Sequence, residues 1–173
     1  VIDTNNASVG NGLIVKYAAK LVKAGKTHEE VLSGINEAIK KTKIYVVLDN
    51  LNSAVKGGRL NPTVKLISDF LNLKPIMSIK KDGSLGPIGA MWGKKNVPNK
   101  IANFLSKKID SNKKYDLAIA HSICEESAEH LRKLLYDKYS NIKSISILEL
   151  GCALGSHTGP GTLAVGVQEH LSI

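Results

Sequence analysis

Short apolar segments that alternate with helix-like segments are the feature that most constrains the fold of this chain. Ile44–Leu48, Leu117–Ala120 and Ile145–Leu148 each have the length of a strand. Ile44–Leu48 is continuous, β-branched and aromatic, as in a strand that is buried on both faces. Leu163–Val167 is a further apolar segment that we interpret as a final strand. Strands that alternate with helices predict an α/β fold with a mixed β-sheet.

Amphipathic periodicity and capping residues place the helices. Apolar residues recur at helical spacing from Leu13 to Val22, and Gly25 is a suitable stop. Thr27 and Glu30 form a capping box, which predicts a helix to about residue 41. Further helices are predicted over residues 51–55, 62–70, 97–109 and 125–139. Residues 75–79 and 86–91 flank Asp82-Gly83, which suits a tight turn, so we expect one β-hairpin in the mixed sheet with flanking helices.

The charge of the chain is positive, with 24 Lys and Arg against 15 Asp and Glu and a formal net charge of +9. Such a charge attracts nucleic acid, anionic lipid headgroups or acidic small molecules. The lysines are scattered along predicted helices, and aromatic residues make up only 5% of the chain, which leaves few rings to stack on bases. We therefore favour solvated lysine-rich helices over a nucleic-acid surface.

Length, hydropathy and cysteine content limit the class of protein. A chain of 173 residues can hold one domain with a core but not two complete ones. No apolar run approaches the roughly 18 residues that cross a bilayer, and the first residues lack the layout of a secretory signal. We expect a cytoplasmic protein without stable membrane insertion. Cys124 and Cys152 have no metal-ligand spacing, and we expect free thiols, with a single disulfide as the alternative.

The strongest functional signal is the segment Gly155-Ser156-His157-Thr158-Gly159-Pro160-Gly161, which closely follows a predicted strand. Open α/β sheets place ligands past the carboxyl ends of strands. Glycines allow backbone amides to form a concave nest for a carboxylate or phosphate. His157 can donate a hydrogen bond, and Ser156 and Thr158 supply hydroxyls. We predict an anion-binding loop; the alternative is an ordinary turn with an exposed histidine.

Known nucleotide and catalytic motifs are missing from the sequence. The Gly-x-Gly-x-x-Gly dinucleotide fingerprint is not matched, and Gly161 is followed by Thr162 where a P-loop requires lysine. There is no Gly-x-Ser-x-Gly elbow, and neither cysteine has a recognisable histidine partner. Arg59 after Gly57-Gly58 is either an exposed residue at a helix end or functional. Lys94 and Lys95 are either solvated or part of a basic docking surface.

Several motifs together resemble the DegV family of bacterial fatty-acid-binding proteins. They cover nearly the whole chain in the family's order, and the last of them is the most specific. The family usually has threonine at the position of Ser156, and serine keeps the hydroxyl. The matching motifs are Val1-Ile2-Asp3-Thr4, Ser8-Val9-Gly10-x-Gly12, Gly57-Gly58-Arg59-Leu60, Leu73-Lys74-Pro75-Ile76 and Gly155-Ser156-His157-Thr158-Gly159-Pro160-Gly161.

The resemblance implies a carrier, not an enzyme. Such a protein buries a long-chain fatty acid between two domains, presents its carboxylate to a separate ATP-dependent fatty acid kinase, and carries the acyl phosphate to an acyltransferase for phospholipid synthesis. No cofactor or metal is implied besides the fatty acid ligand. By motif, His157 would hydrogen-bond the carboxylate or acyl phosphate, and the segment Gly155–Gly161 would shape the site. Arg59, with Lys94 and Lys95, would belong to a basic surface that faces the kinase.

The resemblance also implies that the family's N-terminal domain precedes Val1. Residues 1–25 are then the remnant of that domain, with Val1–Thr4 as the end of one of its strands. Residues 26–173 are the C-terminal α/β domain. Because the N-terminal domain supplies its own serine and threonine ligands to the carboxylate, we expect this part alone to bind lipid weakly.

Two other functions remain as alternatives. The first is an acyl- or phosphoryl-transfer enzyme that uses His157 as acid or base. The second is a nucleic-acid or regulatory partner attracted by the +9 charge. Hydrolysis of an acyl phosphate would favour the former, and salt-sensitive DNA binding the latter. We rank both below the carrier.

Overall fold

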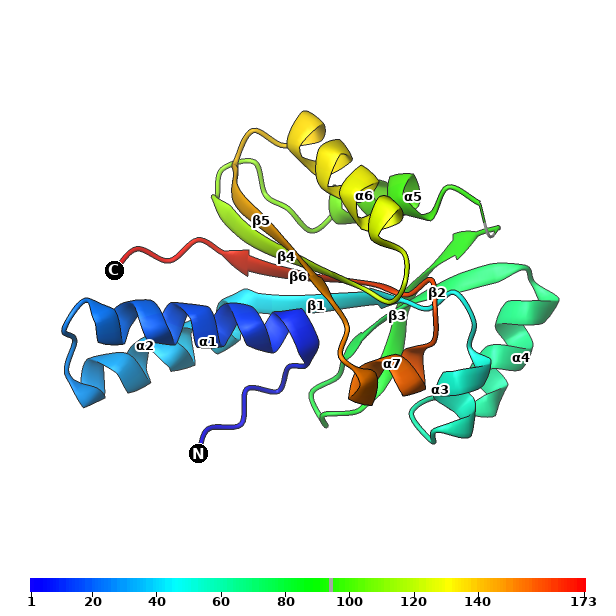
Figure 1. The fold of residues 1–173 in the computed structure, drawn as a ribbon, viewed down its shortest axis with the longest axis horizontal. Coiled ribbons are helices and arrows are strands. Elements are labelled where there is room, and N and C mark those ends of the chain that lie inside the picture. The colour runs from blue at the N-terminus through cyan, green and yellow to red at the C-terminus, as the bar shows by residue number, and fades with distance from the viewer. Residues whose placement is uncertain (94) are drawn as a thin grey trace.

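The structure, a computed structural model, describes residues 1–93 and 95–173, and its described residues form one six-stranded mixed sheet with helices on both faces (Figure 1). The strand order is β3-β2-β1-β6-β4-β5. Lys94 lies outside the described residues. The strands are β1 (Thr42–Val47), β2 (Leu73–Ile79), β3 (Leu85–Trp92), β4 (Tyr115–His121), β5 (Ile142–Glu149) and β6 (Leu163–Glu169).

The last strand, β6, occupies the centre of the sheet. It pairs antiparallel with β1 on one side and with β4 on the other, and Leu163 at its start lies opposite both Val47 and His121. Strands β4 and β5 are parallel, and β2 and β3 form the expected hairpin. The carboxyl ends of β1, β4 and β5 therefore lie at the same edge of the sheet. The predicted α/β fold with a mixed sheet and one hairpin is confirmed.

The helices cover the two faces of the sheet unequally. Helices α5 and α6 lie together on one face, and α1, α3 and α7 lie on the other, with α2 packed against α1 (Figure 1). Thr27 starts α2 with the predicted capping box, in which the Glu30 amide donates to the Thr27 hydroxyl at 3.3 Å. The helices are α1 (Ser8–Lys23), α2 (His28–Lys41), α3 (Asn52–Lys56), α4 (Pro62–Phe70), α5 (Val97–Leu105), α6 (Glu125–Lys138) and α7 (Cys152–Thr158).

Two local predictions were wrong. Helix α5 ends at Leu105 instead of residue 109, because the chain turns there. Residues 152–158 form the helix α7 where we expected a loop. Val1–Thr4 are not assigned to a strand within this chain, and their interpretation as the end of a strand of a preceding domain stays a prediction.

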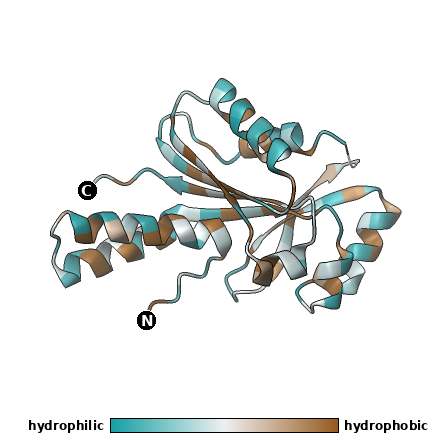
Figure 2. Cartoon of the chain, in the orientation of Figure 1, coloured by the Kyte–Doolittle hydropathy of each residue, from teal (hydrophilic) through white to brown (hydrophobic). Residues whose placement is uncertain are grey.

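Alternate residues of β1 belong to the two cores. Tyr45 and Val47 face α5 and α6, and the Tyr45 ring meets Phe104 edge-to-face at 5.3 Å between centroids. Ile44 and Val46 face α1 and α3. Figure 2 shows that the central strands are mainly hydrophobic, whereas α6 is mainly hydrophilic. Helix α6 is therefore held by its narrow apolar side, on which Leu131 and two other residues are fully buried.

Replacement of Leu131 by alanine tests how much this packing contributes. Leu131 is 0% exposed and lies in the same core as residues of β4. Leu131→Ala should lower the free energy of unfolding by about 2–5 kcal/mol, because it leaves a cavity. Leu66→Ala on α4 is the matched control, since Leu66 is 73% exposed, and it should change stability by less than about 0.5 kcal/mol. Equal midpoints for the two variants in urea denaturation would contradict this assignment of the core.

Candidate functional site

A large cavity lies on the face of the sheet that carries α1, α3 and α7. Helix α3 follows β1 and α7 follows β5, so both begin at the sheet edge where the carboxyl ends of these strands meet. The two helices contact each other. Beside them lies a cavity of about 720 Å³, within the size range of small-molecule sites.

Apolar side chains form most of the cavity wall. Ile44 and Val46 contribute from β1, with Leu48 just beyond that strand, because alternate residues of a strand point to the same face. The hairpin adds Ile79 and Leu85. The remaining apolar lining residues are Ala7, Ala54, Leu150, Ala153, Leu154 and Ala164. Such walls suit a hydrocarbon ligand.

The ionisable side chains that line this cavity are Arg59 and His157; no Asp or Glu is among its described lining residues. Arg59 is exposed, and one of its guanidinium nitrogens, Nη1, donates to the carbonyl oxygen of Gly57 at 3.0 Å. Hydroxyls from Thr158 and Thr162 also line the wall, as do Ser8 and Ser84. A cavity with hydrogen-bond donors and without carboxylates favours an anionic group.

The segment that we predicted as a loop is the end of helix α7, and its amides do not form an open nest. Gly155 donates to Gly151 at 2.9 Å, and Gly159 donates to Gly155 at 2.8 Å. The amide of Gly161 donates to the carbonyl oxygen of Ser122 at 2.8 Å. The expectation of a nest of free amides is therefore wrong: the helix that starts at Cys152 uses the amides of Gly155 and Gly159, and the Ser122 carbonyl oxygen uses that of Gly161.

The two predicted hydroxyls bond to the same helix. Ser156 Oγ donates to the carbonyl oxygen of Ala153 at 3.1 Å, and Thr158 Oγ1 donates to that of Leu154 at 3.0 Å. Thr158 lines the cavity, whereas Ser156 is an exposed residue that does not. Each oxygen keeps a free lone pair, so Thr158 can still accept a hydrogen bond from a ligand.

His157 rests against the glycine that follows α3. A Cβ atom added at Gly57 would overlap the imidazole Nδ1 of His157. Gly57 has φ −79°, which any residue adopts, so its backbone conformation does not require glycine. The space is limited by the imidazole first, and by the Ser53 carbonyl oxygen at 3.1 Å from the added Cβ. The Gly57-Gly58-Arg59 segment thus provides both the surface on which His157 lies and the arginine beside it.

The structure brings together some of the predicted site residues and separates others. His157, Thr158 and Arg59 line one cavity. Gly159 and Gly161, at φ 74° and 80°, form the turn from α7 into β6, and Gly155 lies within α7. Lys95 is exposed between β3 and α5 and is not among the cavity residues, and Lys94 lies outside the described residues.

Sequence reasoning missed Gly57 and the polar residues Ser8, Ser84 and Thr162. We interpreted Gly57 only as part of a helix stop, and no sequence signal pairs it with His157, which lies 100 residues later in the chain. The alternation of Ile44, Val46 and Leu48 could have marked the cavity wall. It was hidden because the intervening residues are equally apolar.

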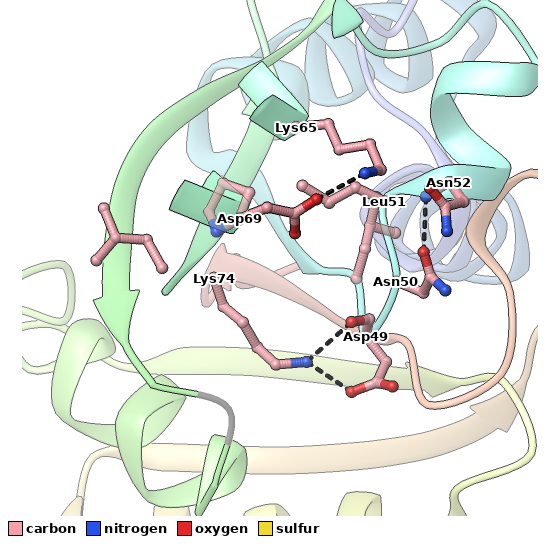
Figure 3. A pocket seen from close by; sticks show the side chains of 10 residues that line it. Asp49, Asn50, Leu51, Asn52, Lys65, Asp69 and Lys74 are labelled. Carbon is pink, nitrogen blue, oxygen red and sulfur yellow. Dashed lines mark hydrogen bonds and ion pairs between the residues drawn. The ribbon is translucent and has the colours of Figure 1, made fainter. Parts of the chain in front are cut away.

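Two further cavities border the same region. One, of about 310 Å³, lies between α1, β4 and β5 and shares Ser8, Leu150 and Leu154 with the larger cavity. The other, of about 270 Å³, is polar and lies where β1 ends, near α4 and the start of β2 (Figure 3). Its charges form internal pairs, Lys74 with Asp49 at 2.5 Å and Lys65 with Asp69 at 2.6 Å. The larger apolar cavity is thus the better ligand site.

Other chemistry has little support in the described part of the chain. Cys124 and Cys152 are free, and burial raises the pKa of the Cys124 thiol, which disfavours a reactive thiolate. Among the described residues, no three His, Cys, Asp or Glu side chains are grouped to hold a metal ion. None of the described helices combines the length and hydrophobicity needed to cross a bilayer.

Comparisons with known proteins agree with this geometry. The family model described as "Uncharacterised protein, DegV family" matches residues 1–170. A DegV domain-containing protein from Clostridium perfringens is 36% identical over 165 residues, which are 95% of this chain and 56% of that protein.

Two solved structures are also similar. A fatty-acid-binding DegV family protein from Streptococcus agalactiae is 26% identical with a TM-score of 0.82, over 99% of this chain and 60% of that one. A DegV family protein from Ruminococcus gnavus, refined with vaccenic acid, is 30% identical with a TM-score of 0.79, over 96% and 58%. The chain thus spans less than two thirds of the length of each of these relatives.

Replacement of Gly57 by alanine tests the seat of His157. The added methyl group should displace the imidazole and cost about 1–3 kcal/mol of stability through overpacking. Gly12→Ala in α1 is the control, since its Cβ would meet nothing within 4 Å, and it should stabilise the helix by about 0.5–1 kcal/mol. The ¹H–¹⁵N spectrum of the His157 ring should change only in Gly57→Ala. An unchanged ring spectrum in that variant would refute the contact.

Proposed function

The chain belongs to the DegV family, and we propose that it binds a long-chain fatty acid with the tail in the cavity of about 720 Å³ and the carboxylate beside His157. The observation that carries the proposal is the composition of the cavity wall. Apolar side chains dominate it, and its ionisable residues are a histidine and an arginine. The relatives from Streptococcus agalactiae and Ruminococcus gnavus, described as fatty-acid-binding and as refined with vaccenic acid, support the same ligand class.

The tail would supply most of the affinity. Each methylene removed from water contributes about 0.8 kcal/mol, so a sixteen-carbon chain gains on the order of 10 kcal/mol before ordering costs. The adjoining cavity of about 310 Å³ extends the apolar surface between α1 and β5 and gives the tail room beyond the first cavity. The preference for a fatty acid chain length would then depend on how much of this second cavity is open to the tail.

The head group would determine where the ligand stops. A carboxylate without partners in an apolar site costs several kcal/mol. His157 can hydrogen-bond it, and Arg59 adds positive charge on the same wall. The Thr158 hydroxyl would donate to the carboxylate only by giving up its bond to the Leu154 carbonyl oxygen. Ser156 and Gly155 would act through α7, and Gly159 and Gly161 through the turn that follows it. The proposal therefore assigns direct contact to His157 and support to the glycines.

We further propose that the protein is a carrier. Its exposed Arg59 at the cavity would face an ATP-dependent fatty acid kinase that phosphorylates the bound carboxylate. The family resemblance alone adds Lys95, which is exposed, and Lys94, which lies outside the described residues, to that basic surface. Delivery of the acyl phosphate to an acyltransferase is a later step of the proposal and rests on the family resemblance alone.

Residues 1–25, which we assign to an N-terminal domain, contribute Ala7 and Ser8 to the cavity. The longer relatives contain a portion that this chain does not match. We propose that the corresponding portion of a complete protein covers the open side of the cavity. The division of the chain at residue 25 belongs to this proposal.

His157→Ala separates the two tasks of the site. It removes one hydrogen bond to a charged group, worth about 1.5–3 kcal/mol, so palmitate binding should weaken by roughly 10–150-fold. Phosphorylation of bound palmitate by an ATP-dependent fatty acid kinase should fall further, because the carboxylate is no longer oriented. His130→Ala on the exposed side of α6 is the control and should alter neither. Normal phosphorylation in His157→Ala would exclude the assigned role.

A further inference from the structure

Lys74 is a buried cation close to the site but outside the cavity that holds His157. It lies in β2, is 3% exposed, and its ammonium contacts Asp49 Oδ1 at 2.5 Å and the Asp49 carbonyl oxygen at 3.1 Å (Figure 3). A buried ammonium is costly unless it is paired. The Asp49 side chain is 59% exposed, so water could solvate this carboxylate without lysine. The Asp49 carboxylate therefore does not need Lys74 as a hydrogen-bond partner. The main effect of the pair is to fix the position of Asp49.

Asp49 in turn lies against the glycine at the end of the His157 segment. A Cβ added at Gly161 would stand 2.7 Å from Asp49 Cβ and 3.0 Å from Cγ. Gly161 also has φ 80°, and its amide is fixed by the Ser122 carbonyl oxygen at 2.8 Å. The turn between α7 and β6 thus has Asp49 on one side and the end of β4 on the other.

Two further contacts continue this one along the same two segments. A Cβ at Gly159 would lie 3.4 Å from Ser53 Oγ, and one at Gly57 would overlap the His157 ring. Residues 49, 53 and 57 recur every four positions and meet residues 161, 159 and 157, which recur every two, in antiparallel order. We call this set of three contacts the α3–α7 interface. His157 is at one end of it and Asp49 at the other.

We propose that Lys74 is a positioning residue for His157: its buried ammonium holds Asp49 against Gly161 and thereby fixes the α3–α7 interface on which the imidazole lies. Neither Lys74 nor Asp49 is among the residues that line the His157 cavity, so their effect passes through the backbone. The role of this placement in holding a carboxylate rests on the proposed function. The placement itself does not, because it is argued only from contacts within this chain.

Lys74→Met is the central variant. Methionine has a similar length and leaves no buried charge, and the exposed Asp49 carboxylate remains solvated, so the fold should survive while Asp49 is released. Asp49→Ala is the second variant: it removes the carboxylate that Lys74 holds and the Cγ atom beside Gly161, keeps Cβ, and leaves the Asp49 carbonyl oxygen to Lys74. Lys65→Met is the matched control: Lys65 lines the same polar cavity but pairs with Asp69 on its own helix.

The measurement is the ¹H–¹⁵N spectrum of the His157 ring in the full chain without fatty acid, at one pH, with circular dichroism as the check of folding. Lys74→Met and Asp49→Ala should both shift the His157 ring resonances, and Lys65→Met should not. The proposal would be overturned if Lys74→Met or Asp49→Ala folds and leaves the His157 ring resonances unchanged. An equal shift of these resonances in Lys65→Met would also overturn it. Loss of folding in both would assign the pair to the fold as a whole and would also overturn it.

A second measurement separates this proposal from the proposed function. Palmitate binding is compared in wild type and in Lys74→Met. Shifted His157 resonances in a chain that never binds palmitate would leave the positioning role intact and reject the fatty acid ligand. If Lys74→Met leaves the His157 resonances unchanged and the chain binds palmitate normally, the fatty acid ligand is kept and the positioning role of Lys74 is rejected.

Discussion

The antiparallel pairing of β6 between β1 and β4 is the constraint on which the rest of the structure depends. It places the carboxyl ends of β1, β4 and β5 at one edge of the sheet. The amino end of β6 lies at the same edge, because β6 is antiparallel to β1 and β4. Helices α3 and α7, which follow β1 and β5, are thereby brought into contact although they lie about 100 residues apart in the chain. The contact between α3 and α7 places His157 beside the apolar residues of β1 that line the cavity.

Close contact between these helices requires small residues, and this explains the glycines better than a nest of amides does. Gly57 leaves room for His157, and Gly161 leaves room for Asp49 at a positive φ. The amides that a nest would have used are bonded to carbonyl oxygens. The glycines thus leave the space in which the imidazole lies, and in the proposed function the electrostatic attraction for an anion comes from His157 and Arg59.

The sequence was sufficient to predict elements with local signals. The capping box at Thr27, the hairpin around Asp82-Gly83 and the apolar strands were found because periodicity and turn chemistry act over a few residues. His157 and Arg59 were singled out, but their shared cavity was not, because it depends on the order of the strands. Helix α7 was missed because its glycines outweighed Cys152-Ala153-Leu154, and the contact of Lys74 with Asp49 spans 25 positions without a sequence signal.

Under the proposed function, an apolar wall and a small polar end should give a bound fatty acid only one orientation in the cavity. The most direct test is a crystal structure of the full chain grown with palmitate. We predict electron density for the tail between β1 and α7, with the carboxylate within hydrogen-bond distance of His157. Palmitate bound elsewhere, or in the cavity with its methyl end at His157, would contradict the account.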